Sequence, residues 1–422
     1  MNPKSSALRS GEKIRSYFLW SYILINTIAT FQIILSNESI GDAANAPYYD
    51  INRILVAASI IIALYYIILF PIFKSFDQIP IKQFFKENTG NNEVVGFRLG
   101  VVLAFLQIMF LVFCLANGVA IAGAGNKKAD DWLLSYFFVL VDTDFLFLIY
   151  YGLYRENKAF YPNAAIWIIS SIARGWNGIF IFILFFEFIR LHRAGLLNVK
   201  LLLLVALASA ILYPVLSAAK WIIRANAFAG VDYGMVVSEL FEAIQAENYF
   251  ELVFDGIQHV ISRLQTVSLL VEVIENASSL QDDLANFRFL PFWLEGIHGI
   301  LFDRLFYGTE RLPVGVVMTE YLAGFTDVEG IGNVNLSFAG WFFIAPMLTP
   351  FYLLYTAALG FFSMYFVKKI DNSRSASDLV WFVWIIYLMP PWLGAVFKFI
   401  YSAVLFLILK IAFANFTRTS VR

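Results

Sequence analysis

Long apolar runs constrain this chain more than any other feature. Stretches of about 20 mostly apolar residues recur at 17–35, 54–73, 99–123, 132–154, 201–220 and 336–367. A hydrocarbon core roughly 30 Å thick takes about 20 helical residues to cross. Hydrophobic residues make up 60% of the 422 residues and charged residues only 14%, a balance that no soluble domain needs. The sequence therefore predicts an all-α, polytopic integral membrane protein with a lipid bilayer around it.

The distribution of Lys and Arg predicts the orientation of this protein. Basic residues gather in the N-terminal tail, at the C-terminus and in the segments 74–98, 155–158, 190–200 and 368–374. Cytoplasmic loops retain positive charge, so we expect these segments and both termini to be cytoplasmic. The first apolar run is longer than a cleaved signal peptide, which predicts a retained signal anchor.

Two further segments need hairpins to keep this orientation. A single crossing at 164–191 would put the basic segment 190–200 outside, and 164–173 alone is too short for a straight span. We expect a hairpin whose tip is formed by Arg174, Gly175, Trp176, Asn177 and Gly178, at or just below the outer face of a cavity. The same reasoning predicts a hairpin at 379–412 around Pro390 and Pro391, for about ten crossings in all.

The predicted domain organisation has three parts. Residues 1–220 carry the first seven transmembrane helices, 221–335 form one large outer loop of helical character, and 336–422 carry the last helices. The loop holds sixteen Asp and Glu, five Arg and no Lys. Its net charge of −11 argues against nucleic acid, whereas arginine forks bind phosphate and carboxylate in a bidentate manner. The arginines either bind phosphate groups or pair with the acids of the loop.

Two stretches of the loop carry candidate site residues. Asp255, His259 and Arg263 are four residues apart, so a helix would place them in one polar stripe. A carboxylate beside a histidine suits a general base, although a solvated helix face has the same pattern. The segment 288–313 mixes aromatic residues with charged ones, which suits sugars or a loop lying on the bilayer surface.

Other chemistry has little support. The chain has no Walker loop, no GxGxxG and no HExxH, and its three histidines predict neither a metal site nor a cofactor. Asp142 and Asp144 lie inside an apolar run, where an acid either touches substrate or pairs with a cation of another helix. The single cysteine, Cys114, excludes an intramolecular disulfide.

This layout resembles the O-antigen polymerases of the Wzy type and the related O-antigen ligases. Ala173-Arg174-Gly175 is similar to the family's SRG at an outer hairpin, and SRLQTVSLLVEVIE resembles an Arg-led loop helix that starts at Arg263. FYGTERLP is similar to a stretch with a further arginine, here Arg311, and GNVNLSFAGWFF resembles the start of the next helix. Family members often have an acid where this chain has residues 333–335. Ligases usually carry a histidine before that helix, and its absence here favours a polymerase.

The resemblance implies a GT-C-like fold and an enzyme of the bacterial inner membrane with its active site on the periplasmic face. Such an enzyme is a glycosyltransferase that joins undecaprenyl-diphosphate-linked repeat units into lipopolysaccharide O-antigen, capsule or exopolysaccharide, without a metal. Its implied partners are the lipid-linked donor and acceptor, a chain-length regulator and a flippase. The candidate site residues are His259 and Asp255 as the catalytic pair, Arg174, Arg263, Arg304 and Arg311 on the diphosphates, and Trp176, Asn177, His298 and Glu320 as further substrate-binding residues.

Three alternatives stay open. An O-antigen ligase would use the same chemistry on another acceptor. A flippase or other transporter would spread charged residues through many helices, whereas the arginines here gather at one hairpin and one loop. A glycosyltransferase that uses a polyprenyl-phosphate sugar usually has an acidic pair in its first outer loop, where this chain has Glu38, Asp42 and Asp50.

Overall fold

The structure is a computed structural model of the whole chain. It describes residues 3–36, 38–43, 50–84, 89–122, 131–176, 178–227, 231, 233–246, 258, 261, 264–308, 311–323, 334 and 336–419. In these ranges the chain is helical, and its only β-type pairing is an isolated bridge between Phe289 and Leu312. The prediction of an all-α chain is confirmed.

Seven helical stretches within the described ranges, two of them interrupted by a short break or turn, are long and apolar enough to cross a bilayer. They are Glu12–Ser36, Ile51–Asp77, Asn92–Asn117, Leu133–Tyr154, Val199–Asn226, Pro346–Ile370 and Leu393–Phe416. The chain is thus a polytopic membrane protein. The ten crossings and the sides of the loops stay predictions.

The first half of the chain supplies helices α1 to α9. Their bounds are α1 Pro3–Ser36, α2 Ile51–Ile67, α3 Phe73–Asp77, α4 Thr89–Asn117, α5 Trp132–Leu140, α6 Thr143–Tyr154, α7 Phe160–Ala173, α8 Ile179–Arg193 and α9 Val199–Asn226. A π-helical turn, η2 (Ile68–Ile72), joins α2 to α3 and contains Pro71. Proline has no N–H to donate, which explains the irregular turn at this point.

The second half supplies the loop helices and the last spans. The loop helices are α10 Tyr233–Ala246, α12 Val267–Glu275, α13 Ala277–Ala285, α14 Ile297–Phe306 and α15 Val314–Ala323. The later helices are α16 Gly340–Ile344, α17 Thr349–Ile370, α18 Arg374–Val383 with its π-helical end η5 (Trp384–Leu388), and α19 Leu393–Thr419. Between Leu388 and Leu393 the chain turns at the predicted prolines.

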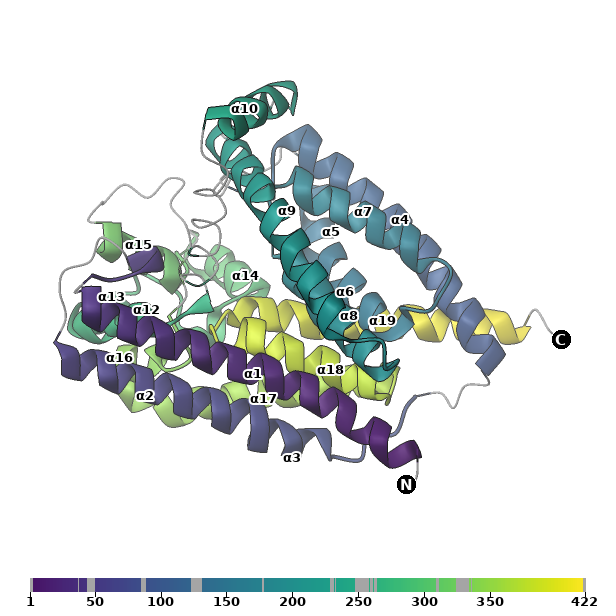
Figure 1. Cartoon of the computed structure of the whole chain (residues 1–422), viewed down its shortest axis with the longest axis horizontal. Coiled ribbons are helices and arrows are strands. Elements are labelled where there is room, and N and C mark those ends of the chain that lie inside the picture. Colours follow the sequence, from purple (N-terminus) through teal and green to yellow (C-terminus); the bar gives the residue numbers. More distant parts are fainter. Residues whose placement is uncertain are drawn as a thin grey trace.

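Helices α6, α18 and α19 form the centre of the packing. Figure 1 shows α4 and α7 side by side in one arm of the molecule, and α1 and α2 in another; α4 and α6 pack on α19, while α1 packs on α2, α8 and α18. The centre is rich in aromatic rings, such as Phe185 stacked on Trp381 at 5.6 Å between ring centroids. Close packing of large rings is the main source of stability here, since lipid is as apolar as the core.

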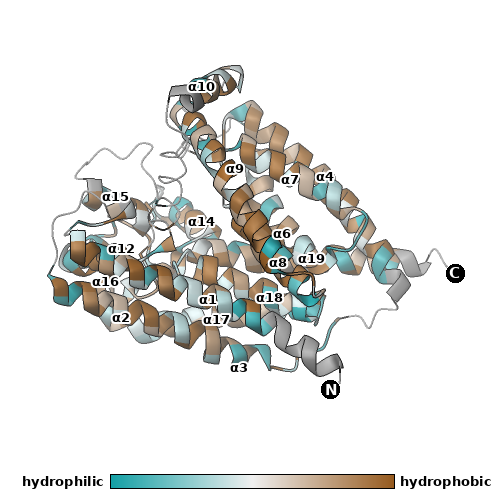
Figure 2. Cartoon of the chain, in the orientation of Figure 1, coloured by the Kyte–Doolittle hydropathy of each residue, from teal (hydrophilic) through white to brown (hydrophobic). Residues whose placement is uncertain are grey.

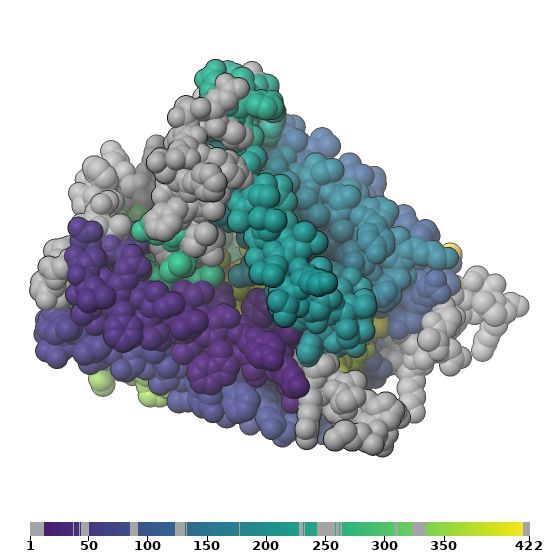
Figure 3. Space-filling model, viewed as in Figure 1, coloured from purple at the N-terminus to yellow at the C-terminus, as the bar shows by residue number. Residues whose placement is uncertain are grey.

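Helix α9 lies at the edge of the packing. Figure 3 shows it on the surface of the face in view, and Figure 2 shows that it is apolar along most of its length. Its leucines at 203, 204 and 207 are exposed, and only Pro214 and Ile223 are buried. An exposed apolar helix of this length faces lipid.

The turn between α7 and α8 follows directly from its sequence. Gly175 has a φ of +73°, its N–H donates to Ile172 O, and the N–H of Trp176 donates to Ser171 O. These two bonds are the Schellman motif, in which glycine adopts the left-handed conformation just after the helix end. The motif places Arg174 at the carboxyl cap of α7.

Two predicted spans are broken rather than continuous. The run 132–154 divides into α5 and α6 because Val141 and Asp142 are not helical, and the side chain of Asp142 caps α6 by accepting from Phe145 N at 3.1 Å. The run 336–367 is interrupted at Ala345 and Pro346, so the long helix there extends from 346 to 370. In both places a capping residue or a proline outweighs the apolar composition.

The loop contains helices, and part of it is buried. Helix α12 packs on α2 and α16, with Val267, Leu270 and Val273 fully covered. The predicted polar stripe of Asp255, His259 and Arg263 lies outside the described residues, and the next described helix along the chain is α12.

Candidate functional site

Arg174 lies at the centre of a buried ion pair. Its Nη2 donates to both carboxylate oxygens of Asp144, at 2.9 and 3.0 Å, and its Nε donates to the hydroxyl and the carbonyl of Ser170 at 3.2 Å. The guanidinium also lies over the ring of Phe110, with 4.8 Å between its carbon and the ring centroid. Trp167 donates its indole N–H to the same carboxylate at 3.2 Å. An arginine in an apolar segment is thus compensated by an acid from another helix, as intramembrane charges usually are.

The break between α5 and α6 places two acids at one helix start. Asp142 caps α6 and Asp144 lies in its first turn, where the helix dipole stabilises negative charge. Asp142 also lies 3.7 Å from the ammonium of Lys398 on α19. The two acids therefore pair with different cations, Arg174 and Lys398, and the cluster of four has no net charge. We call these four residues the ion cluster.

The two members of the central pair differ in exposure. The side chain of Arg174 is 4% exposed, whereas that of Asp144 is 39% exposed. An anion that approaches the ion cluster therefore meets the carboxylate before the guanidinium. To bind Arg174, it has to displace Asp144 or bind Nη1.

The turn around Arg174 is tied to its surroundings by hydrogen bonds. The carbonyl of Arg174 accepts from Ala122 N at 2.8 Å, and the indole of Trp176 donates to Ala120 O at 3.1 Å. The hydroxyl of Tyr233, at the start of α10, donates to the carbonyl of Ala173 at 2.9 Å. These bonds fix the turn, while the ring of Trp176 stays exposed.

Helix α14 of the loop contacts α5 and α19. Arg304 contacts the hydroxyl of Tyr136 on α5. The ring of His298 lies 4.4 Å from that of Phe397, the residue before Lys398 on α19. His298 also bonds the carbonyl of Trp293 through Nε2, at 2.7 Å. The loop thus brings Arg304 to α5, the helix that precedes Asp142 in the chain, and His298 to α19, the helix that carries Lys398.

Two glycines allow this close approach. A Cβ at Gly296 would lie 3.4 Å from the Cα of Gly394, and Gly296 has a φ of +126°. Because L side chains rarely adopt this conformation, glycine is needed on the loop side. Glu295 precedes it, and its carboxylate accepts from Leu393 N at the start of α19. Burial raises the pKa of Glu295 to about 8, although the Leu393 bond opposes the shift.

Arg311 is held by a buried acid within the loop. Its Nη2 lies 2.6 Å from Asp303, Nε donates at 3.0 and 3.1 Å to the two oxygens, and the backbone N donates at 2.9 Å. Burial alone would raise the pKa of Asp303, but the bonds from Arg311 outweigh it and hold that pKa below its usual value. Arg311 and Asp303 join the end of α14 to the segment before α15, which is a structural role in this state.

A second arginine of the loop is also paired. Arg288 donates to Asp283 at 2.8 Å and contacts Glu320. Tyr321 donates to the same Asp283 at 2.9 Å. Glu320, expected to bind substrate, therefore lies in an ion pair that joins α13 to α15.

A second loop acid is buried. Glu272 is 3% exposed, and burial together with the nearby Glu275 raises its pKa to about 7, although a bond from Asn276 opposes this. An acid with a pKa near 7 suits proton transfer, and such shifts often mark functional sites.

Several expected site residues lie outside the described part of the chain. These are His259, Asp255, Arg263 and Asn177. Among the described ones, Arg174 and Trp176 share the α7/α8 turn, while His298 and Arg304 share α14. No contact joins Arg311 or Glu320 to the ion cluster among the described interactions. The sequence interpretation did not include Lys398, and it left the partner of Asp144 open.

The ion cluster mixes cations and acids without a metal-binding arrangement. Among the residues that the structure describes, no three His, Cys, Asp or Glu side chains gather in a way that would hold a metal ion. Comparison of the chain with protein-family models, with curated proteins and with solved structures found no match.

Proposed function

We propose that this protein is a membrane glycosyltransferase of the O-antigen polymerase type. It joins undecaprenyl-diphosphate-linked oligosaccharide repeat units on the periplasmic face of a bacterial inner membrane. The support is the family resemblance of the sequence, the polytopic helical fold and one observation above all: the Arg174–Asp144 pair, buried on the cation side and open on the acid side.

The pair suits an exchange of partners. A substrate diphosphate carries more negative charge than one carboxylate and has oxygens that match the guanidinium fork. When it takes the place of Asp144 on Arg174, the carboxylate of Asp144 is released beside the reacting groups. The arginine then neutralises the charge that grows on the leaving diphosphate.

The released carboxylate gives the reaction a base. The acceptor hydroxyl oxygen attacks the anomeric carbon of the donor sugar, and its proton passes to the base. The bond from that carbon to the diphosphate oxygen breaks, and the electron pair leaves with the undecaprenyl diphosphate. Asp144 serves as this base in the ion cluster, and His259 with Asp255 is the alternative pair from the loop.

The loop supplies the second set of contacts. Arg304 and His298 on α14 approach α5 and α19 next to the ion cluster, and Trp176 exposes its ring at the turn. Aromatic rings and charged donors of this kind bind sugars through stacking and hydrogen bonds. Arg263 and Arg311 are the further candidates for the second diphosphate, and Asn177 and Glu320 for the sugars.

The test is a reaction with purified components. Detergent-purified protein is incubated with a lipid-linked repeat unit and a chelator, without nucleotide, and the products are resolved by gel electrophoresis. We expect a ladder of polymer from the wild type and at least a tenfold lower rate from Arg174→Lys, which keeps the charge but not the fork. Arg53→Lys, an exposed arginine paired with Glu275, is the matched control and should react at the wild-type rate. Absence of polymer from folded wild type would reject the proposal.

A further inference from the structure

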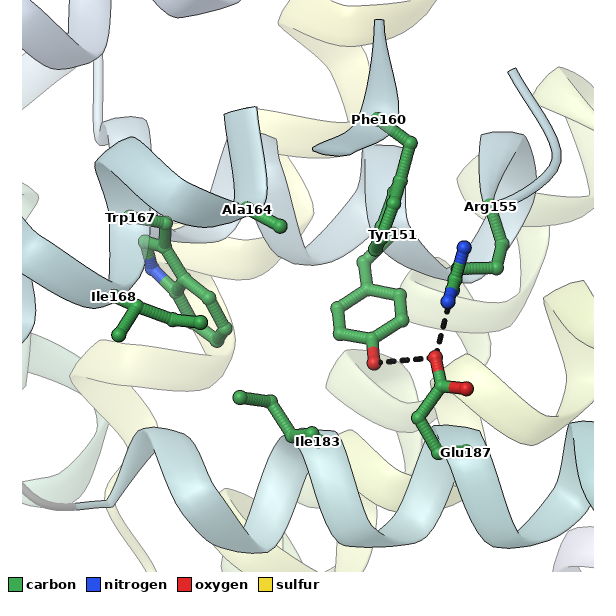
Figure 4. A pocket seen from close by; sticks show the side chains of 8 residues that line it. All are labelled: Tyr151, Arg155, Phe160, Ala164, Trp167, Ile168, Ile183 and Glu187. Atoms are coloured by element: carbon green, nitrogen blue, oxygen red, sulfur yellow. Dashed lines mark hydrogen bonds and ion pairs between the residues drawn. The ribbon is translucent and has the colours of Figure 1, made fainter. Parts of the chain in front are cut away.

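A cavity lies between α6, α7 and α8, away from the Arg174 turn. It has a volume of about 220 Å³ and is lined by Tyr151, Arg155, Phe160, Ala164, Trp167, Ile168, Ile183 and Glu187 (Figure 4). The two arms of the hairpin have different partners, since α7 packs on α4 and α6 whereas α8 packs on α1. The cavity occupies the space between these arms.

Most of the cavity wall is apolar. Rings of Phe160 and Trp167 and the aliphatic side chains of Ala164, Ile168 and Ile183 form it. A cavity of about 150 Å³ holds a benzene molecule, so this one has room for about nine carbon atoms by proportion. That is the size of a stretch of hydrocarbon chain.

One end of the cavity is polar and carries a net positive charge. Glu187 accepts from Arg155 Nε at 2.6 Å, from Arg190 Nε at 2.7 Å and from the hydroxyl of Tyr151 at 2.8 Å. Figure 4 shows Tyr151 and Arg155 pointing at Glu187, with Trp167 at the opposite end. Two guanidiniums thus surround one carboxylate. Both bond it through Nε, so their terminal amino groups take no part in these bonds.

This polar end has the features of a membrane interface. It lies at the basic segments 155–158 and 190–200, and the guanidinium of Arg155 is 5.0 Å from the ring centroid of the exposed Tyr161. Basic and aromatic residues at helix ends are typical of the headgroup region. A net positive charge there attracts anionic lipid headgroups.

The other end is closed toward the ion cluster. Trp167 lines the cavity, is buried, and donates its indole N–H to Asp144. An acyl chain whose headgroup lies at Glu187 therefore extends toward Trp167. A lipid whose diphosphate lies at Arg174 would have to approach from the opposite side of Trp167.

We propose that this cavity is a binding site for an anionic glycerophospholipid, with its phosphate on Arg155 and Arg190 and part of one acyl chain between α7 and α8. The site is separate from the proposed reaction and does not depend on it. Its two requirements, a cationic headgroup contact and an apolar slot, can be removed one at a time.

The experiment uses the full chain reconstituted in vesicles of equal phosphatidylglycerol and phosphatidylcholine. After mild extraction, native mass spectrometry counts the lipids that stay bound. We expect the wild type to retain phosphatidylglycerol over phosphatidylcholine. Arg155→Gln, which leaves Glu187 bonded to Arg190, and Ala164→Phe, which fills the slot, should each retain at least fivefold less. The matched controls Lys74→Gln and Ala208→Phe change an exposed cation and an exposed alanine elsewhere and should bind as the wild type does.

Several results would overturn the proposal. Equal retention of the two lipids by the wild type would show that no contact selects the anionic headgroup. Undiminished binding by both cavity variants would show that the lipid binds elsewhere. Displacement of phosphatidylglycerol by undecaprenyl phosphate in the wild type but not in Ala164→Phe would assign the slot to the substrate's chain. If Ala164→Phe does not fold, Ile183→Phe fills the same slot from α8.

Discussion

The asymmetric exposure of the Arg174–Asp144 pair predicts an asymmetric response to mutation. Two unit charges about 4 Å apart interact by about 4 kcal/mol at an effective dielectric constant of about 20. Asp144→Asn leaves a guanidinium that is 4% exposed without its counter-charge, whereas Arg174→Met leaves a carboxylate that is 39% exposed and stays in the first turn of α6, where the helix dipole stabilises negative charge. Removing one partner of a buried pair costs about 3–5 kcal/mol. We therefore expect Asp144→Asn to lower the free energy of unfolding by about 2–3 kcal/mol, because asparagine still accepts one hydrogen bond from Arg174. Arg174→Met should lower it by about 1–2 kcal/mol.

The double variant, which carries both Asp144→Asn and Arg174→Met, tests whether the two charges stabilise each other. With both charges gone, the loss should be about 2 kcal/mol smaller than the sum of the single losses. The single cysteine, Cys114, gives the assay, since it is buried in α4, the helix that also carries Phe110. A thiol-reactive dye labels it only when this region opens. At about 2 °C per kcal/mol for a chain of this length, Asp144→Asn should lower the labelling midpoint by about 4–6 °C. Single losses that simply add in the double variant would refute the coupling.

Three further predictions concern topology, proton transfer and pH. On a Cys114→Ser background, single cysteines within 221–335 should be labelled from outside the cell and those within 370–377 should not. With Asp144 as the base, Asp144→Asn should lower turnover by about 10² to 10⁴ while His259→Gln stays within a few-fold of wild type, as rates over a substrate series would show. Burial raises the pKa of Glu295 from 4.5 to about 8, so the folded state keeps a proton that the unfolded state loses. The contribution of Glu295 to the stability of the wild type therefore falls as the pH rises from about 4.5 to about 8. Over that range the Glu295→Gln protein should become more stable relative to the wild type.

Each of these has an outcome that contradicts it. Labelling of 370–377 from outside would invert the proposed orientation. A loss of turnover of about 10²-fold or more in His259→Gln would make His259, and not Asp144, the base. A Glu295→Gln protein whose thermal midpoint follows wild type at every pH, as the exposed control Glu93→Gln should, would show that Glu295 ionises freely in the folded state.

The position of Arg174 in the chain could be predicted, but its partner could not. Basic segments lie on both sides of 164–191, and both can be cytoplasmic only if the chain turns back between them. The glycine after the arginine forms the Schellman motif that ends α7. The bond to Asp144 depends on the helix break at Val141 and Asp142. Hydropathy does not predict that break, because the break arises from the hydrogen bond by which Asp142 caps α6.

For the loop, too, the sequence predicts the helices but not their contacts. The helical character of the loop could be predicted from the sequence, and its described helices include α10, α12, α14 and α15. Which loop residues meet the membrane helices depended on contacts far apart in sequence, such as Gly296 with Gly394 and Arg304 with Tyr136. Composition suggested that the arginines either bind phosphate or pair with acids. Arg288 and Arg311 have acid partners in the structure.

Substrate affinity tests most directly whether a diphosphate takes the place of Asp144 on Arg174. The dissociation constant of undecaprenyl diphosphate is measured for wild type, Asp144→Asn and Arg174→Lys in the same detergent. Removing the competing carboxylate should tighten binding in Asp144→Asn, even though turnover falls, while Arg174→Lys should weaken binding at least tenfold. Weaker binding by Asp144→Asn, or unchanged binding by Arg174→Lys, would contradict the exchange and leave the pair as a structural link between α6 and α7.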